Sequence, residues 1–146
     1  MLLIADEVMC GCGRRGKEFA ITHWDVVPDI LVTAKGIEGG HVPLAATIVK
    51  REIHDAFLKG SGRFIHGHPC GGNPLSCAVG SAVLELVREW RLVERAGEQG
   101  KYMKGRLQEL YKYPFIGDVR GKGLTLGIGL VQDRRSKEPF LPEIRL

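Results

Sequence analysis

The chain opens with short, unbroken runs of apolar residues instead of an alternating pattern. Residues 2–5 stop at Asp6, residues 30–34 stop at Lys35, and residues 44–49 form a third run. Runs without alternation are typical of strands that are buried on both faces, as in a parallel sheet. The pattern therefore predicts three strands, of which the first two end at an ionisable residue.

Helical periodicity begins in the middle of the chain. Asn73 followed by Pro74 predicts a helix start, because Asn caps a helix N-terminus and Pro suits the first helical position. Apolar residues then recur at three- and four-residue steps up to Trp90, and we expect Cys77 in this helix to be a small core residue. A second helix is predicted over residues 92–110.

Two further strands, residues 116–120 and 124–131, flank a glycine-rich turn near the end of the chain. The element order favours an α/β fold in which a mainly parallel sheet with helices leads into a smaller α+β piece. We place the boundary between the two predicted helices, near residues 88–92. The expected domains are therefore 1–90 and 91–146.

Composition and charge exclude several classes of protein. With 44% apolar and 26% charged residues over 146 positions, the chain is typical of a soluble globular protein. No apolar run approaches the ~20 residues of a membrane span, and the first residues lack the basic region of a signal peptide. We therefore expect a cytoplasmic protein without a membrane partner. The net charge is +4, and the basic residues are scattered along the chain, so we expect no nucleic-acid partner.

Residues 11–16 form a literal G-x-G-x-x-G, the spacing of dinucleotide-binding turns. In such turns the first glycine follows the strand directly, whereas here Asp6 and Glu7 stand between the strand and Gly11. Carboxylates at that position would repel a pyrophosphate. A glycine-rich connecting loop is the favoured interpretation, and a nicotinamide enzyme is the weaker alternative.

Cysteines and histidines are clustered at two places in the chain. The first cluster is Cys10 and Cys12, and the second is His66, His68 and Cys70. Zinc ligands are usually separated by two to four residues and matched by a second pair. A single intervening residue is tight, and no second pair has the right spacing. We therefore predict no metal site, and no disulfides in a cytoplasmic chain.

Asp6 and Lys35 together suggest a specific chemistry. Each follows a buried-type strand and precedes a glycine-rich loop, and ligands gather at the carboxyl ends of strands in open α/β sheets. An aspartate keeps a nearby ring nitrogen protonated, and a lysine that loses proton affinity becomes a nucleophile for a Schiff base. This pairing is the signature of pyridoxal phosphate (PLP) chemistry.

Beyond these two residues, nearly the whole chain resembles class III aminotransferases, which are PLP enzymes of fold type I, the aspartate-aminotransferase fold. The resemblance is carried, in the family's order and spacing, by residues 2–9, 11–16, 28–37, 39–44, 66–68, 72–78 and 117–124. Each segment alone is weak evidence, but the combination is specific. The resemblance implies part of the family's large PLP-binding domain over residues 1–90 and part of its small C-terminal domain over residues 91–146.

The resemblance also implies a role for individual residues. Asp6 would pair with the pyridinium nitrogen of PLP, and Val8 would pack against one face of its ring. Lys35 would form the internal aldimine and then carry a proton between the substrate Cα and the cofactor. The implied activity is transfer of an amino group from an amino donor to a keto acid, and complete relatives form homodimers. We expect Lys35 to be catalytic, and Asp6, Val8 and Lys35 to bind the cofactor.

Three positions depart from the family pattern. Pro69 stands where a phosphate-binding threonine is typical, Arg15 replaces a threonine, and Gly129 replaces a glutamate. The segments that supply the main phosphate site and the substrate-binding arginine in this family lie outside the sequence, so we expect a fragment. The alternative function is that of a catalytically inactive remnant with at most residual PLP binding.

A fragment of an α/β domain lacks some of the strands that would cover its sheet. Such a sheet would expose a backbone edge and the apolar faces of Leu3, Ile4, Leu31 and Val32. We therefore expect the isolated chain to aggregate or to fold only with a partner.

Overall fold

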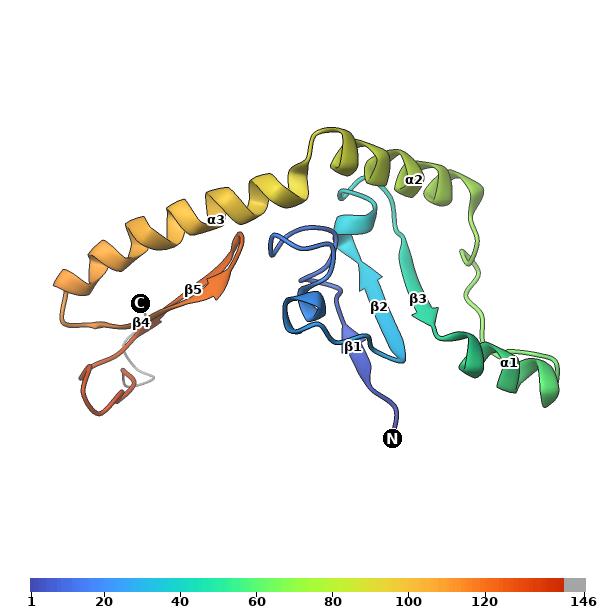
Figure 1. Cartoon of the computed structure of the whole chain (residues 1–146), viewed down its shortest axis with the longest axis horizontal. Coiled ribbons are helices and arrows are strands. Elements are labelled where there is room, and N and C mark those ends of the chain that lie inside the picture. The colour runs from blue at the N-terminus through green and yellow to red at the C-terminus, as the bar shows by residue number, and fades with distance from the viewer. Residues whose placement is uncertain (141–146) are drawn as a thin grey trace.

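The computed structural model describes residues 1–140 and arranges their strands in two separate sheets (Figure 1). The first sheet has the order β1 (Ile4–Asp6), β2 (Ile30–Ala34) and β3 (Ala45–Val49). β1 and β2 are parallel, as predicted, whereas β3 pairs antiparallel with β2. Three expected strands therefore form, and the described part of this sheet is mixed.

The interior of this sheet lies along its central strand, β2. Leu31 is buried and Thr33 is only 1% exposed, while Val32 is half-buried. At the edge of the sheet, Leu3 and Ile4 are exposed, Ile4 by 60%. The expectation of exposed apolar faces is thus correct for Leu3 and Ile4 but wrong for Leu31, which is buried, and Val32 is intermediate.

The capping signal of the first long helix is confirmed. Asn73 precedes α2 (Pro74–Glu89), and its side-chain oxygen accepts a 3.2 Å hydrogen bond from the Ser76 N–H. Arg91 interrupts the helical register with a φ of 50°, and α3 (Leu92–Gln108) follows. A short 3₁₀ turn, η3, then spans Glu109–Lys112.

The helix α1 (Arg51–Lys59) is absent from the sequence prediction. Its nine residues are too few to show a clear helical periodicity. Its apolar residues Ile53 and Phe57 are four positions apart and so lie on one face, but no capping side chain marks its start.

Much of the apolar face of α2 is exposed. Leu75 is 67% exposed and Trp90, at the C-cap, is 55% exposed. Gly80 is buried where the helix passes Leu44. Cys77 is exposed, so its expected place in the core is wrong, because no element of residues 1–140 covers that side of the helix.

The second sheet is a hairpin that packs against α3 (Figure 1). It consists of β4 (Ile116–Lys122) and β5 (Thr125–Leu130), the two strands predicted on either side of the glycine-rich turn, and they pair antiparallel. Ile116, Val119 and Val131 are buried and form the core of this part of the chain.

The two sheets lie under two consecutive helices, with α2 beside the first sheet and α3 beside the hairpin (Figure 1). The junction between α2 and α3 therefore lies close to the loop that follows β1. Residues 141–146 of the expected second domain lie outside the described residues. In the described chain, no helix combines the length and the apolar character that crossing a membrane requires.

Candidate functional site

Parallel pairing of β1 and β2 brings two predicted site residues to one edge of the sheet (Figure 1). Asp6 is the last residue of β1 and pairs in register with Val32. Lys35 follows directly after the last residue of β2. Both residues therefore lie at the carboxyl ends of parallel strands, where ligands bind in open α/β sheets.

A hydrogen bond links the side chain of Asp6 to the backbone of Val8. The Asp6 carboxylate is exposed, and its Oδ1 accepts a 3.0 Å hydrogen bond from the Val8 N–H. Val8 itself is half-buried. The turn after β1 thus fixes an acidic group and an apolar side chain relative to each other.

Lys35 has a strained backbone and an unpaired amine. It begins the 3₁₀ turn η2 (Lys35–Ile37) with a φ of 51°, in the left-handed region. For a residue other than glycine this conformation costs about 1–3 kcal/mol, and such strain is concentrated at functional sites. The turn is packed tightly, because a Cβ at Gly36 would lie 2.8 Å from the Cβ of Cys12. The side chain is exposed, and within residues 1–140 it forms no ion pair.

Val8 and Lys35 line a common cavity of about 660 Å³. The cavity lies between the loop after β1, η2, the start of α3 and the hairpin, and its volume is typical of small-molecule sites. Asp6 does not line the cavity and connects to it through its hydrogen bond with Val8. The structure therefore brings two of the three predicted residues into one cavity and places the third one hydrogen bond away.

The same cavity contains polar side chains that the sequence does not single out. Arg14 comes from the glycine-rich loop, Arg95 and Gln99 come from α3, and Thr125 comes from β5. Arg95 and Gln99 are four residues apart and so share a helix face, which is the one sequence signal that groups them. The two arginines give the cavity positive charge, which attracts phosphate and carboxylate groups.

Glu7 is the second acid of the Asp6–Glu7 pair that follows the first predicted strand, and the sequence assigns it no role of its own. It is only 3% exposed, and its Oε1 accepts a 2.7 Å hydrogen bond from the Ile21 N–H in the 3₁₀ turn η1 (Ala20–Trp24). Its Oε2 is buried and has no hydrogen-bond partner among the described residues. Glu7 thus ties the segment between Asp6 and Val8 to a neighbouring turn.

The G-x-G-x-x-G segment is a packing junction. A Cβ at Gly13 would lie 2.9 Å from the side chain of Val93, and one at Gly16 would lie 2.7 Å from the Cα of Gly97. Both glycines also have a positive φ, of 87° and 78°. Close approach of α3 and these backbone angles explain the glycines, in line with the favoured interpretation of a connecting loop.

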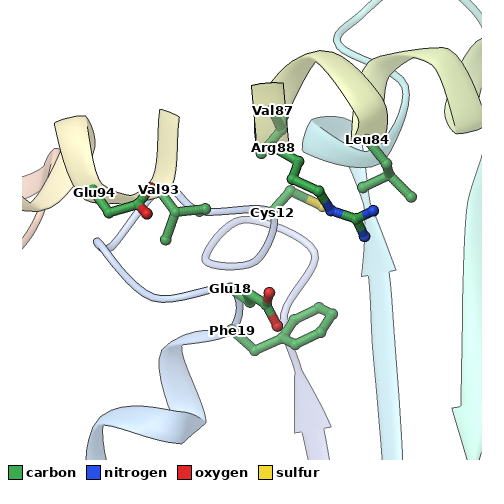
Figure 2. A pocket seen from close by; sticks show the side chains of 9 residues that line it. Cys12, Glu18, Phe19, Leu84, Val87, Arg88, Val93 and Glu94 are labelled. Atoms are coloured by element: carbon green, nitrogen blue, oxygen red, sulfur yellow. The ribbon is translucent and has the colours of Figure 1, made fainter. Parts of the chain in front are cut away.

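A second hollow, of about 400 Å³, adjoins the first and shares Cys12 and Val87 with it. Figure 2 shows the side chain of Arg88 extending from α2 into this hollow, with Glu18 and Phe19 on the opposite side. None of the predicted site residues lines it. The candidate site is therefore the cavity of Val8 and Lys35.

The cysteine and histidine clusters form no metal centre in the described chain, where no three His, Cys, Asp or Glu side chains gather to hold an ion. Cys10 and Cys12 are half-buried, and the Sγ of Cys12 lies 3.6 Å from the Oγ1 of Thr33. His66 and His68 lie in the exposed loop before α2, with their Nε2 atoms 3.2 Å apart.

The three departures from the family pattern lie in different places. Pro69 belongs to the exposed loop before α2. Arg15 is half-buried, and its backbone packs against Gly123 in the turn of the hairpin. Gly129 lies in β5, where a Cβ would lie 3.3 Å from a guanidinium nitrogen of Arg120.

Sequence comparison agrees with this geometry. The chain matches the family model of class-III aminotransferases over residues 1–145. It is 45% identical over 140 residues to the uncharacterized aminotransferase YhxA of Bacillus subtilis (strain 168), an alignment that covers 94% of this chain and 31% of that protein. It is 43% identical over 143 residues to adenosylmethionine-8-amino-7-oxononanoate aminotransferase of Anoxybacillus flavithermus (strain DSM 21510 / WK1), covering 96% and 32%.

Solved structures extend the likeness to the fold. An (S)-enantioselective omega-transaminase from Thermomicrobium roseum superimposes with a TM-score of 0.94 at 42% identity, over 98% of this chain and 32% of that one. An amine transaminase from an uncultivated Pseudomonas species, in its PLP-bound form, superimposes with a TM-score of 0.94 at 41% identity. This alignment covers 98% of this chain and 33% of that one. The chain thus spans about a third of the length of these relatives and has the expected α/β fold of fold type I. It belongs to the class-III aminotransferase family.

Proposed function

We propose that this chain carries the cofactor-binding lysine and aspartate of a PLP-dependent aminotransferase, which moves an amino group from an amino donor to a keto acid. The observation that supports this most is the cavity that Val8 and Lys35 share, at the strand ends where Asp6 also lies. Class III aminotransferases are PLP enzymes, and one structural neighbour is PLP-bound. The proposal assigns Lys35 as the catalytic residue.

The side chains at this cavity suit PLP. When bound, the cofactor supplies an aldehyde that condenses with amines and a ring that withdraws electrons from the substrate. Its phosphate suits the positive charge of Arg14 and Arg95, and its ring suits the apolar side chain of Val8. The cavity itself therefore offers side chains that suit the phosphate and the ring, whereas Asp6, the proposed partner of the ring nitrogen, does not line it.

Asp6 supplies the negative charge in this proposal. A carboxylate favours the protonated form of a ring nitrogen within a few ångströms. The hydrogen bond from the Val8 N–H holds Oδ1 of Asp6, so the carboxylate has a fixed orientation while its Oδ2 can accept another bond. Asp6 thus acts by holding a proton on the ring nitrogen.

Lys35 acts first as a nucleophile and then as a base. No carboxylate pairs with its Nζ within residues 1–140. A neutral lysine amine is the form that attacks a carbonyl. When Nζ is released, it can take a proton from the substrate carbon and hold it for return at another atom.

The proposal extends to the organisation of the protein. Residues 1–90 would form the cofactor-binding part and residues 91–146 a smaller domain, with the cavity lined from both. The small-molecule partners would be an amino donor and a keto acid. Assembly as a homodimer belongs to the same proposal and is supported by the exposed apolar residues of α2, such as Leu75 and Trp90.

The test is to mix the purified chain with PLP, record visible absorption, reduce with borohydride and map the pyridoxyl group by mass spectrometry. We expect a yellow absorption band and a pyridoxyl group on Lys35, both of which Lys35→Ala abolishes. Lys59→Ala, which removes an exposed lysine at the end of α1, is the matched control and leaves the band unchanged. Asp6→Asn keeps the label on Lys35 but weakens binding of PLP.

Label spread evenly over surface lysines would contradict the assignment of Lys35. Turnover is tested separately, by adding L-alanine to the loaded chain and measuring pyruvate. Labelling at Lys35 without pyruvate would favour the alternative of a PLP-binding but inactive chain, which Pro69 supports because it offers neither a hydroxyl nor a backbone N–H to a phosphate.

A further inference from the structure

Five cationic side chains surround a cavity that adjoins the one containing Lys35 and shares Leu126 with it. This cavity of about 530 Å³ lies between the glycine-rich loop, α3 and the turn of the hairpin. The cations come from all three segments: Arg15 and Lys17 from the loop, Lys101 and Lys104 from α3, and Lys122 from the hairpin. We name these residues the cationic cluster.

Acidic side chains do not neutralise the cationic cluster. Glu94 and Glu98 are the acids that line the cavity, and Glu94 pairs with Arg91, which lies outside it. Within residues 1–140, no member of the cluster forms an ion pair. The five cations outnumber the two acids around this hollow, so repulsion among the cations is only partly offset, and an anion that enters relieves it.

The partners that the cluster does have are neutral. Lys104 donates a 3.2 Å hydrogen bond to the backbone oxygen of Gly121, and Lys122 lies 5.5 Å from the centre of the Trp24 ring. The Nε of Arg15 is buried and has no acceptor among the described residues. A buried guanidinium N–H without an acceptor is costly, so the site is one acceptor short of being satisfied.

We propose that the cationic cluster binds a small polyanion, a metabolite that carries at least two negative charges, as in a diphosphate or a tricarboxylate. Ammonium and guanidinium groups from three segments can approach such a molecule from several sides. The cavity has the volume of a small-molecule site, which favours a compact ligand over a polymer. Arg15, whose buried Nε has no acceptor among the described residues, is the member of the cluster most in need of a partner.

This inference is independent of the proposed function. Lys35, Val8 and Asp6 do not line the cationic cavity. Loss of PLP binding on Lys35→Ala should therefore leave polyanion binding unchanged, and the two proposals can fail separately.

Trp24 provides a reporter for the test. The chain has two tryptophans, so Trp90→Phe leaves Trp24 as the single one, next to Lys122. Inorganic pyrophosphate and citrate are titrated in separate arms at low salt, with Trp24 fluorescence and calorimetry as readouts. We expect at least one of the two anions to bind saturably and more weakly when salt is added. Tighter binding of pyrophosphate would indicate a phosphate ligand, and tighter binding of citrate a carboxylate ligand.

Two double variants locate the binding. Lys101→Gln with Lys104→Gln removes two cations of the cluster, while Lys59→Gln with Lys112→Gln removes two exposed lysines elsewhere. We expect the first pair to weaken binding at least about tenfold and the control pair less than about twofold, with unchanged circular dichroism. Arg15→Thr should weaken binding as well. The proposal is overturned if neither anion saturates the signal, or if both pairs weaken binding equally.

Discussion

The backbones of Gly100 and Gly123 are in direct contact: a Cβ added at Gly100 would lie 2.2 Å from the carbonyl carbon of Gly123. This contact joins α3 to the turn of the hairpin, and Gly123 in turn packs against the backbone of Arg15. Glycine is therefore required at position 100 by close packing, although it weakens a helix interior. The loop, the helix and the hairpin that border both cavities are held together at this point.

A pair of glycine substitutions in α3 tests this contact. Gly100→Ala should destabilise the chain by about 1–3 kcal/mol, because backbone atoms of Gly123 cannot move aside as a flexible side chain would. Gly105→Ala lies in the same helix, and within residues 1–140 no heavy atom beyond the adjoining helix backbone lies within 4 Å of the new Cβ. It should stabilise the chain by about 0.5–1 kcal/mol through the better helix propensity of alanine. Urea unfolding of both variants measures the difference.

Both variants replace glycine by alanine in α3, and both raise the intrinsic helix propensity of the substituted position. A similar change in stability for both would show that the contact between Gly100 and Gly123 does not constrain α3. Opposite signs would show that packing outweighs propensity at position 100 and that propensity alone acts at position 105.

The buried carboxylate of Glu7 should contribute to stability through its bond with the Ile21 N–H. Glu7→Ala removes the acceptor and should cost roughly 1–3 kcal/mol, with faster hydrogen exchange at the Ile21 amide. Glu7→Gln keeps an acceptor oxygen and should retain most of the protection. Glu18→Ala, which removes an exposed carboxylate nearby, is the control and should change stability by less than about 0.5 kcal/mol. Unchanged exchange at Ile21 in Glu7→Ala would contradict the assignment.

The edge strand β1 should promote self-association. Ile4 is 60% exposed on an edge strand of its sheet, and apolar edges of this kind pair with other chains. We expect the mass measured by sedimentation to rise with concentration, and Ile4→Lys to shift this rise to higher concentration. Val27→Lys makes the same change at a residue that is 75% exposed but outside the strands, and should have little effect. A wild-type chain that stays monomeric throughout would refute the prediction.

Local signals in the sequence specify much of the fold. Asn73 and Pro74 mark the start of α2 because capping depends only on neighbouring residues. The runs before Asp6 and Lys35 are found as strands for a similar reason, since an unbroken apolar run is itself a local signal, although only alternate residues of these strands are buried. Pairing of β3 in the opposite direction has no such local signal, because strand direction depends on how the connection between strands folds.

Tertiary packing decides the rest of the candidate site. Asp6 and Lys35 are identified by their positions at strand ends and Val8 by the family resemblance, whereas Arg95 and Gln99 reach the cavity because α3 folds back against the loop after β1. Cys77 is a position where the sequence prediction is wrong. Helical periodicity places it among apolar neighbours, but its side chain is exposed. A hydrophobic pattern predicts the face of a helix, and contact with another element determines whether that face is buried.

Asp29 should make the stability of the sheet depend on pH. Its Oδ1 pairs with Lys50 Nζ at 2.8 Å, and its Oδ2 accepts a 2.7 Å hydrogen bond from the Leu3 N–H, so it links the ends of all three strands. These contacts, the hydrogen bond from Lys50 foremost, lower the pKa of Asp29 below its ordinary value of 3.8. An NMR titration of the Asp29 carboxyl carbon should show this, and Lys50→Met should raise the pKa toward 3.8.

The sign of the effect on stability follows from the lowered pKa of Asp29. The contribution is fully present above pH 3.8, where the carboxyl of the unfolded chain is also ionised, and is lost as the pH falls through the lower folded pKa. Asp29→Asn should therefore lower the free energy of unfolding at neutral pH, and the difference from wild type should shrink in acid below pH 3.8. Asp25→Asn, at an exposed aspartate without an ion pair among the described residues, is the control. A difference between Asp29→Asn and wild type that is the same at neutral and acidic pH would show that shape, and not charge, holds the strand ends together.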